Sequence, residues 1–234
     1  MALPKLETSK YTAVIPSSKK TIEFRPFLVK EEKILMMAQE SKDNLQIIGA
    51  LKDIIKSCTF NTVDPSELTT YDLEYLFLQL RAKSVGETSE IKIKCDECGE
   101  YNEVSVNLSD AEVKNPNDSV DKKIELNDTV GIIMRPISLA KSEDLSKIKK
   151  DEDIFINSII ASIESIYDNN GVYYTDDTSE KDLKEFVESL SHKHLEEIQK
   201  YLSAQPKLQL EVKFKCNKCG HDNSIIIEVL ESFF

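Results

Sequence analysis

Four of the five cysteines lie in two copies of one short motif, C-x-x-C-G, whose spacing is typical of metal binding. The first copy holds Cys95 and Cys98, and the second holds Cys216 and Cys219. Two residues between the cysteines let both thiolates face one metal ion, and the following glycine adopts the backbone shape that brings peptide N–H groups close to sulfur. Alternating runs flank each copy, so we expect a strand on either side. This arrangement predicts two zinc knuckles.

Together the two knuckles supply four thiolates, which fill the tetrahedral shell of Zn²⁺. We therefore predict one structural zinc per chain, bound by Cys95, Cys98, Cys216 and Cys219. A filled shell leaves no position for a reactive water molecule, and such a site contributes on the order of 10 kcal/mol to folding. Because 117 residues separate the two pairs, we expect a zinc ribbon split by a long insertion and built from residues 91–108 and 208–230. Closure within one chain is the simplest arrangement, because covalent linkage keeps the two pairs at high effective concentration.

Three other interpretations of these cysteines stay open: two disulfides, a redox pair, and a site in which His221 replaces a thiolate. Disulfides are disfavoured in the reducing cytosol, where we expect a chain without a secretory signal to be made. A redox pair belongs at a helix N-terminus, which depresses the thiol pKa, whereas both motifs lie between predicted strands. Four cysteines fill the shell without His221. The fifth cysteine, Cys58, ends an apolar helical run, and we predict that it is buried.

No other group of side chains has the spacing of a catalytic or nucleotide-binding site. His192 and His194 lie two residues apart on a predicted helix, so they point in different directions and cannot share a metal ion. The acidic runs 151–153 and 176–177 lack the spacing of a calcium-binding loop. The 6 glycines form neither a dinucleotide-binding motif nor a P-loop. We therefore expect no catalytic residues, no cofactor besides zinc and no small-molecule substrate.

Beyond the cysteines, two long segments of the chain resemble each other. Residues 90–106 and 211–227 align without a gap and are identical at 7 of 17 positions. Further upstream, a predicted β-hairpin runs into an Arg-Pro pair in each segment, at Arg25 and again at Arg135. We predict an internal duplication, with a first half over 10–108, a linker over 109–121 that centres on Asn115-Pro116-Asn117-Asp118, and a second half over 122–230. The zinc ribbon would join the two halves.

Between hairpin and knuckle, both halves show the 3.6-residue apolar period of helices, which together with the strands predicts an α+β fold. In the first half, helices are expected around 45–58 and over 71–82, the second with Thr70 as its N-cap. In the second half, an isoleucine stripe from Ile156 to Ile166 predicts a helix that breaks at Asn169-Asn170-Gly171. Apolar positions over 183–202 predict further helices that end before Pro206.

The composition is that of a globular protein with little attraction for nucleic acid. Its 234 residues carry a formal net charge of −12, and the knuckle segments show no basic stripe. No window approaches the roughly 18 apolar residues that a membrane span requires, so no membrane contact is expected. The apolar run 229–234 either completes the last strand or docks on a partner.

The N-terminal sequence resembles that of a known family. Residues 1–8 read MALPKLET, Tyr11 follows, and residues 24–33 read FRPFLVKEEK. This pattern resembles the baseplate hub proteins of T-even-type contractile-tailed phages, most strongly over residues 1–37. The resemblance implies a non-enzymatic structural or assembly role in the baseplate hub during tail morphogenesis. It implies hub proteins and the tape-measure protein as candidate partners, and the host cytoplasm and the virion tail baseplate as locations.

A second class of function stays open beside this one. A zinc ribbon also occurs in proteins that associate with nucleic acid, so the alternative is a phage transcription or recombination factor. Binding to DNA that weakens with rising salt would favour that alternative.

Overall fold

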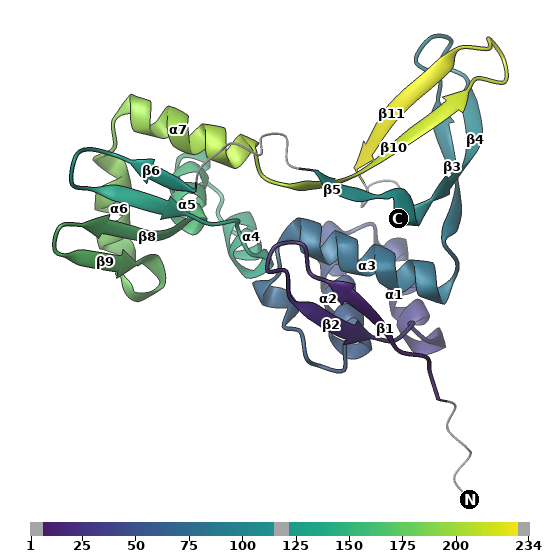
Figure 1. Cartoon of the computed structure of the whole chain (residues 1–234), viewed down its shortest axis with the longest axis horizontal. Coiled ribbons are helices and arrows are strands. Elements are labelled where there is room, and N and C mark those ends of the chain that lie inside the picture. Colours follow the sequence, from purple (N-terminus) through teal and green to yellow (C-terminus); the bar gives the residue numbers. More distant parts are fainter. Residues whose placement is uncertain (1–6, 115–121, 229–234) are drawn as a thin grey trace, which may run out of the picture. The chain divides into compact units, whose positions relative to one another are not determined.

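The computed structural model describes residues 7–114 and 122–228, which form two compact units (Figure 1). The first unit combines Met1–Lys114 with Lys207–Phe234, and the second covers Asn115–Pro206. The proposed linker centre at Asn115-Pro116-Asn117-Asp118 and the apolar run 229–234 lie outside the described residues. None of the described helices is long and apolar enough to cross a membrane.

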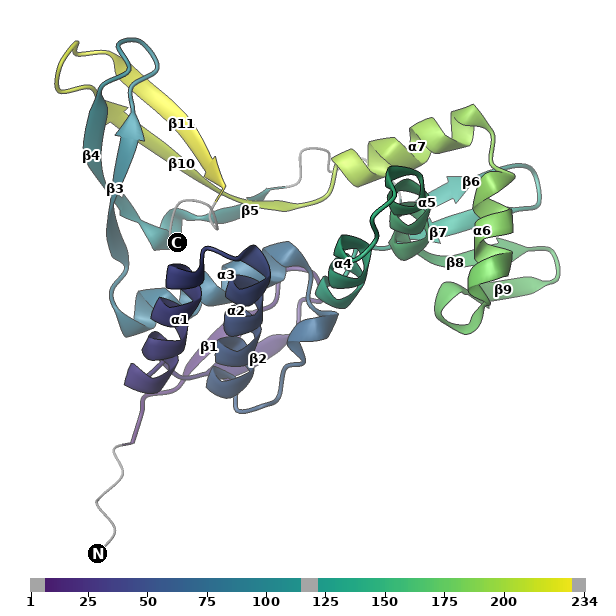
Figure 2. The same cartoon turned by 180° about the vertical axis from the view of Figure 1, so that it is seen from behind.

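The first unit begins with a β-hairpin that packs on three helices. Strands β1 (Tyr11–Val14) and β2 (Thr21–Phe24) are antiparallel, and helices α1 (Val29–Ser41), α2 (Asn44–Cys58) and α3 (Thr70–Ser84) follow, with a 3-10 turn η1 (Pro65–Glu67) before α3 (Figure 2). The core side chains come from β2, α2 and α3: Phe24, Leu51, Ile54, Ile55, Leu73 and Phe77. Helix α2 buries one face because its apolar residues recur at the helical period, as predicted, whereas α3 has buried residues on several faces.

The N-terminus of α3 also anchors the hairpin. Thr69, one residue before the predicted cap, caps α3, and Asp72 accepts hydrogen bonds from the Thr69 backbone N–H (3.1 Å) and hydroxyl (2.6 Å). The other carboxylate oxygen of Asp72 accepts from the backbone N–H of Ser17 in the hairpin turn, at 2.9 Å. Thr69 and Thr70 are adjacent in the sequence, and either could cap this helix. The structure uses Thr69, and Asp72 of the same cap also binds Ser17, 55 residues away in sequence.

The rest of the first unit is a β-ribbon made of two hairpins. Strand β3 (Thr88–Lys94) pairs with β4 (Tyr101–Asn107), and β10 (Lys207–Lys215) pairs with β11 (Asp222–Glu228). After the turn η2 (Leu108–Asp110), the short strand β5 (Glu112–Lys114) adds to β10, so part of the stretch predicted as linker is a third strand of that sheet. Buried residues from both hairpins form one small core: Ile93, Val106, Leu210 and Val212. Leu78 of α3 packs against Leu108 and Leu208, which joins this ribbon to the helices.

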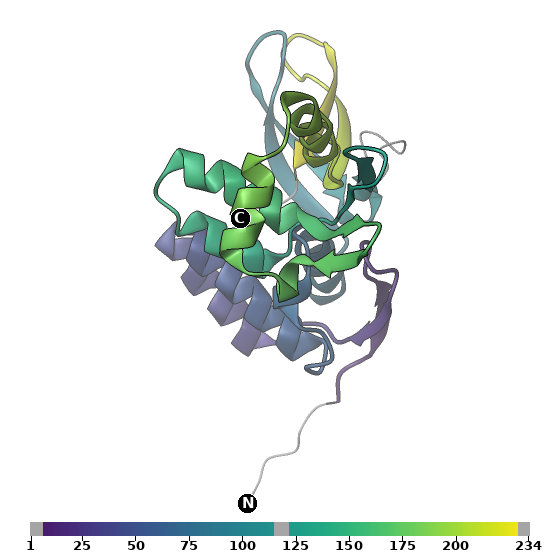
Figure 3. The same ribbon diagram turned by 90° about the vertical axis from the view of Figure 1, so that its left-hand side faces the viewer.

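The second unit is a four-stranded antiparallel sheet covered on one face by helices. Its strands are β6 (Lys123–Glu125), β7 (Gly131–Met134), β8 (Ile163–Asp168) and β9 (Gly171–Tyr174), in that spatial order. Its helices are α4 (Leu139–Ser146), α5 (Asp151–Ser162), α6 (Glu180–Glu188) and α7 (His192–Ser203), with a 3-10 turn η3 (Thr175–Asp177) before α6. The core joins sheet residues such as Ile132 and Met134 to Ile159 of α5, Val187 of α6 and Ile198 of α7. Figure 3 gives another view of these elements, which are drawn in teal to green.

The helix predicted from Ile156 to Ile166 is wrong in its second part. Helix α5 ends at Ser162, and Ile163–Asp168 forms β8, which pairs with β7 and with β9. The isoleucines fit a helical period, but Ile163 and Ser165 are buried while Glu164 between them is exposed, which is the alternation of a strand. Asn169 and Asn170 therefore form the turn of a β-hairpin and do not end a helix.

Each predicted half begins with a β-hairpin and ends with a knuckle, but the elements in the middle of the two halves differ. In both, a hairpin precedes an Arg-Pro pair whose arginine N–H bonds to the carbonyl of the last residue of a helix: Arg25 to Cys58 (3.0 Å) and Arg135 to Ser162 (2.7 Å). The β8–β9 hairpin has no counterpart in the first half. Because contacts place both knuckles in the first unit, the compact units do not coincide with these halves, and the duplication stays a prediction.

Candidate metal centre

Each C-x-x-C-G motif forms the tight turn between two strands of the ribbon. In the first turn the Gly99 N–H bonds to the Cys95 carbonyl (2.9 Å), and the Cys95 N–H bonds to the Glu100 carbonyl (2.8 Å). In the second turn Cys216 bonds to Gly220 and His221 in the same way, at 3.0 and 2.8 Å. Both glycines have φ values in the left-handed region, +71° and +77°, which other residues adopt only with strain. The repeated sequence therefore gives a repeated backbone.

The two turns meet, and their four sulfur atoms form one cluster. The Sγ atoms of Cys95, Cys98, Cys216 and Cys219 all lie within 4.8 Å of one another. Cys95 Sγ is 3.8 Å from Cys219 Sγ, and Cys98 Sγ is 3.6 Å from Cys216 Sγ. Zn–S bonds of about 2.3 Å place the corners of a tetrahedron about 3.8 Å apart, whereas a disulfide would hold two sulfur atoms at about 2.05 Å. The cluster is therefore free of disulfides and has the dimensions of a four-thiolate metal site.

The cluster is half covered by the ribbon. Cys95 and Cys216, the first cysteine of each turn, are 2% and 3% exposed, while Cys98 and Cys219 are exposed. An entry path for a metal ion therefore exists beside the two outer sulfur atoms. These four residues could hold a metal ion, and the sequence prediction that they bind zinc stays a prediction.

The surroundings favour ionised sulfur at two of these cysteines. The backbone N–H of Cys98 holds the pKa of the Cys95 thiol below its usual range, and the backbone N–H of Cys219 lowers the pKa of Cys216 to about 6. At Cys219 the His221 N–H lowers the pKa, but burial and the neighbouring sulfur atoms outweigh it and raise that pKa to about 12. Like charges this close oppose each other's ionisation, and a divalent cation at the centre would compensate them.

Two buried asparagines, which the sequence analysis did not single out, connect the two turns. Asn102 follows the first turn, and its Oδ1 accepts from the Asn217 N–H (2.9 Å) in the second turn. Asn223 follows the second turn, and its Oδ1 accepts from the Asp96 N–H (3.0 Å) in the first. An ion pair between Lys218 and Glu100, at 2.7 Å, also crosses between the turns. The sequence repeat could have pointed to these asparagines, because Asn102 and Asn223 form one of its seven identical pairs.

The other cysteine and the three histidines that the sequence offered as candidate site residues do not contribute side chains to the cluster. His221 contributes its backbone to the second turn, and the group of potential metal ligands there contains cysteines alone. Cys58 is fully buried at the end of α2, as predicted, and burial raises its pKa to about 11. His192 Nδ1 lies 3.3 Å from the exposed Glu196 carboxylate, and His194 Nδ1 accepts the N–H of Ser191, which is the N-cap of α7.

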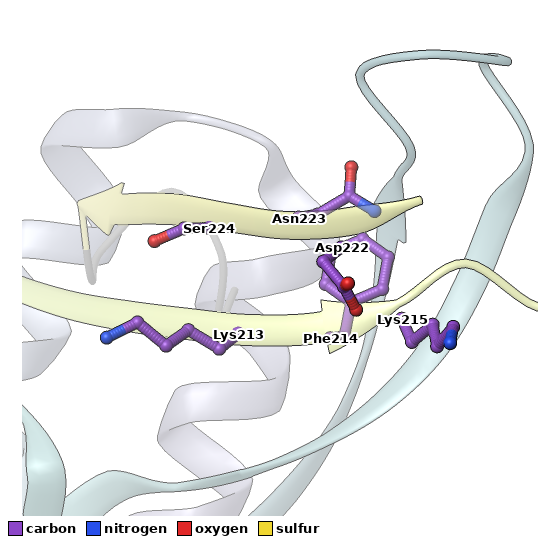
Figure 4. A pocket seen from close by; sticks show the side chains of 6 residues that line it. All are labelled: Lys213, Phe214, Lys215, Asp222, Asn223 and Ser224. Atoms are coloured by element: carbon purple, nitrogen blue, oxygen red, sulfur yellow. The ribbon is translucent and has the colours of Figure 1, made fainter. Parts of the chain in front are cut away.

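A shallow hollow lies on the outer β10–β11 hairpin, close to the second turn (Figure 4). Its lining combines two lysines with small polar and aromatic side chains: Lys213, Phe214, Lys215, Asp222, Asn223 and Ser224. This lining contains no cysteine or histidine, and its carboxylate, Asp222, does not belong to the group of potential metal ligands that the four cysteines form.

Comparisons with known proteins identify relatives of this chain. The family described as T4 bacteriophage base plate protein matches residues 8–234. The baseplate hub assembly protein gp26 of Enterobacteria phage T4 is 29% identical over 216 residues, which cover 92% of this chain and 93% of that protein. No solved structure matched the chain.

Proposed function

Because the chain belongs to the T4 bacteriophage base plate protein family, we propose that it acts in assembly of the tail baseplate hub, through contacts with other proteins and not by catalysis. The family match is the observation that carries this proposal, since it spans both compact units. The T4 relative, named a hub assembly protein, is similar over almost its whole length. Hub proteins are the first candidate partners, and the tape-measure protein is a second. The chain would work in the host cytoplasm during assembly, with the virion tail baseplate as a further location.

The segment that carries the N-terminal resemblance builds a specific structure. Arg25 and Glu31 of the FRPFLVKEEK stretch form an ion pair at 2.8 Å, between side chains that are 11% and 3% exposed. Glu31 also accepts from the Leu28 N–H at 2.9 Å, at the start of α1. This stretch therefore fixes how α1 leaves the hairpin.

Helix α1 exposes three large apolar side chains, beside the charged residues Lys33 and Glu40, on a face that suits contact with another baseplate component. Val29, Met36 and Met37 are 80%, 57% and 62% exposed. Val29 and Met36 lie two turns apart, opposite the buried residues Glu31 and Ala38. Large exposed apolar groups of this kind mark interaction sites, and methionine adapts to irregular partner surfaces. We assign this face to a protein partner within the baseplate.

A purification from infected cells tests the proposal. The tagged chain should copurify with baseplate proteins identified by mass spectrometry, and a Met36→Glu, Met37→Glu double variant should lose them. Val85→Glu is the matched control, because Val85 lies in the same unit and is 64% exposed. Loss of the same partners in the control would remove the assignment to α1. Recovery of polymerase subunits without tail proteins, with salt-sensitive DNA binding, would instead support the nucleic-acid alternative.

We also propose that the four cysteines hold one structural Zn²⁺ in a split ribbon. The spacing of the four sulfur atoms supports a closed shell, and among the described residues the group of potential ligands contains cysteines alone. Bound zinc would cross-link residues 95–98 to residues 216–219 and would take no part in a reaction. Metal analysis of the purified protein should give about one zinc per chain. A metal-free protein with four reactive thiols and an intact fold would contradict this proposal.

A further inference from the structure

We propose that Asn102 and Asn223 are positioning residues of the metal centre: each holds the opposite knuckle in register, and Asn102 also donates a hydrogen bond to the inner sulfur atom of the opposite knuckle. This inference rests on the proposed metal site and extends it from the four ligands to the groups that orient them.

Asn102 uses all of its amide hydrogen-bonding groups at the junction of the turns. Its Nδ2 donates to the Glu100 carbonyl (3.0 Å) in its own turn and to Cys216 Sγ (3.7 Å) in the other. Its Oδ1 accepts the Asn217 N–H. The side chain therefore connects the backbone of one knuckle to both the backbone and a sulfur atom of the other.

Asn223 repeats the backbone contacts of this pattern in the opposite direction. Its Nδ2 donates to the His221 carbonyl (3.0 Å) in its own turn. Its Oδ1 accepts the Asp96 N–H. The two asparagines are thus related by the same approximate symmetry as the two knuckles, and each accepts a backbone N–H of the opposite turn.

Burial makes the amide specifically suited to this position. Asn102 and Asn223 are 2% and 4% exposed, so each donor and acceptor requires a partner within the protein. An amide supplies an acceptor for the backbone N–H and a donor for sulfur, whereas a carboxylate supplies acceptors alone. Donation to sulfur stabilises thiolate charge, and groups that orient metal ligands in this way typically change metal affinity by about 10–100-fold.

Metal titration of the full chain tests the proposal. Metal-free protein, kept reduced, is titrated with Zn²⁺ against a chromophoric chelator, and with Co²⁺, whose thiolate absorption reports the ligand shell. Asn102→Ala and Asn223→Ala should each weaken zinc binding about 10–100-fold. Asn102→Asp should weaken it at least as much, although aspartate keeps an acceptor for Asn217, because it loses the donor to Cys216.

Val212→Ala is the control, because Val212 lies in the ribbon core and contributes only packing. If this control weakens zinc binding as much as Asn102→Ala at an equal loss of thermal stability, the asparagines act only through folding and the proposal is wrong. Wild-type-like affinity of Asn102→Asp would overturn the role of sulfur donation. If the wild-type chain binds neither Zn²⁺ nor Co²⁺, the proposed metal site fails; if it binds one ion and the asparagine variants match it, only the present inference fails.

Discussion

Replacing Glu31 by glutamine tests how strongly the start of α1 depends on one buried charge. Glu31 accepts hydrogen bonds from the Arg25 guanidinium (2.8 Å), the Ser57 hydroxyl (2.9 Å) and the Leu28 N–H (2.9 Å). Its side chain is 3% exposed, so little water screens these contacts. Glutamine keeps the shape but removes the charge, which leaves the Arg25 guanidinium buried without a counterion.

The magnitude follows from the pKa of Glu31. Burial raises this pKa, but the hydrogen bonds from Arg25, Leu28 and Ser57 outweigh burial and lower it from 4.5 to about 2. A difference of this size corresponds to about 3 kcal/mol of folding free energy. Because the folded pKa lies below the unfolded one, this contribution is complete above about pH 5 and disappears as the pH falls toward 2.

Glu31→Gln should therefore lose about 3 kcal/mol in urea unfolding at pH 7, and its stability should change less than that of wild type between about pH 5 and pH 2. Glu32→Gln is the control, since Glu32 lies in the same turn and is exposed. Replacing both partners, Arg25→Met with Glu31→Leu, should restore most of the loss. Equal urea midpoints for Glu31→Gln and Glu32→Gln would contradict the stabilising role of the Glu31 charge.

Three further substitutions test other parts of the structure. Cys95→Ser should abolish stoichiometric zinc binding and lower the melting temperature, and undiminished zinc content by metal analysis would contradict the four-cysteine site. Asp72→Ala removes the acceptor of the Ser17 N–H and half of the α3 cap, so urea unfolding should show a loss of about 2 kcal/mol, and an unchanged midpoint would count against it. Gly131→Ala would place a methyl group 2.8 Å from Cε1 of the Tyr167 ring and against its hydroxyl end, so thermal unfolding should show about 1–3 kcal/mol of destabilisation, and an unchanged melting temperature would contradict this.

Local patterns were sufficient to predict the knuckles and most helices. The C-x-x-C-G motifs and their flanking strands depend on residues a few positions apart, and the structure contains them. That the two motifs lie together did not follow from local pattern. It followed from chemistry, because two thiolates leave a zinc shell half filled and the chain contains one other matching pair.

Long-range pairing explains what the sequence analysis missed. Strand β5 has only three residues, too few for an alternating pattern, and it forms because Val113 lies opposite Leu208 of β10. Residues 163–168 suit a helix by their apolar spacing, and it is pairing with β7 and β9 that makes them a strand. The roles of Asn102 and Asn223 likewise require the opposite knuckle, so the repeat could mark these positions but not their contacts.

The same pairing explains how a chain can close a site from cysteines so distant in sequence. Lys114 and Lys207, the residues of the first unit that flank the second unit in sequence, are partners in the β5–β10 ladder. The entropy of closing this long loop is therefore offset by backbone pairing and by Leu108 and Leu208 packing on Leu78, before any metal contributes. What remains for the metal is to join two hairpins that the ribbon core already holds face to face. On this account the second unit is an insertion whose length has little effect on the ribbon, because loop closure entropy grows only slowly with loop length.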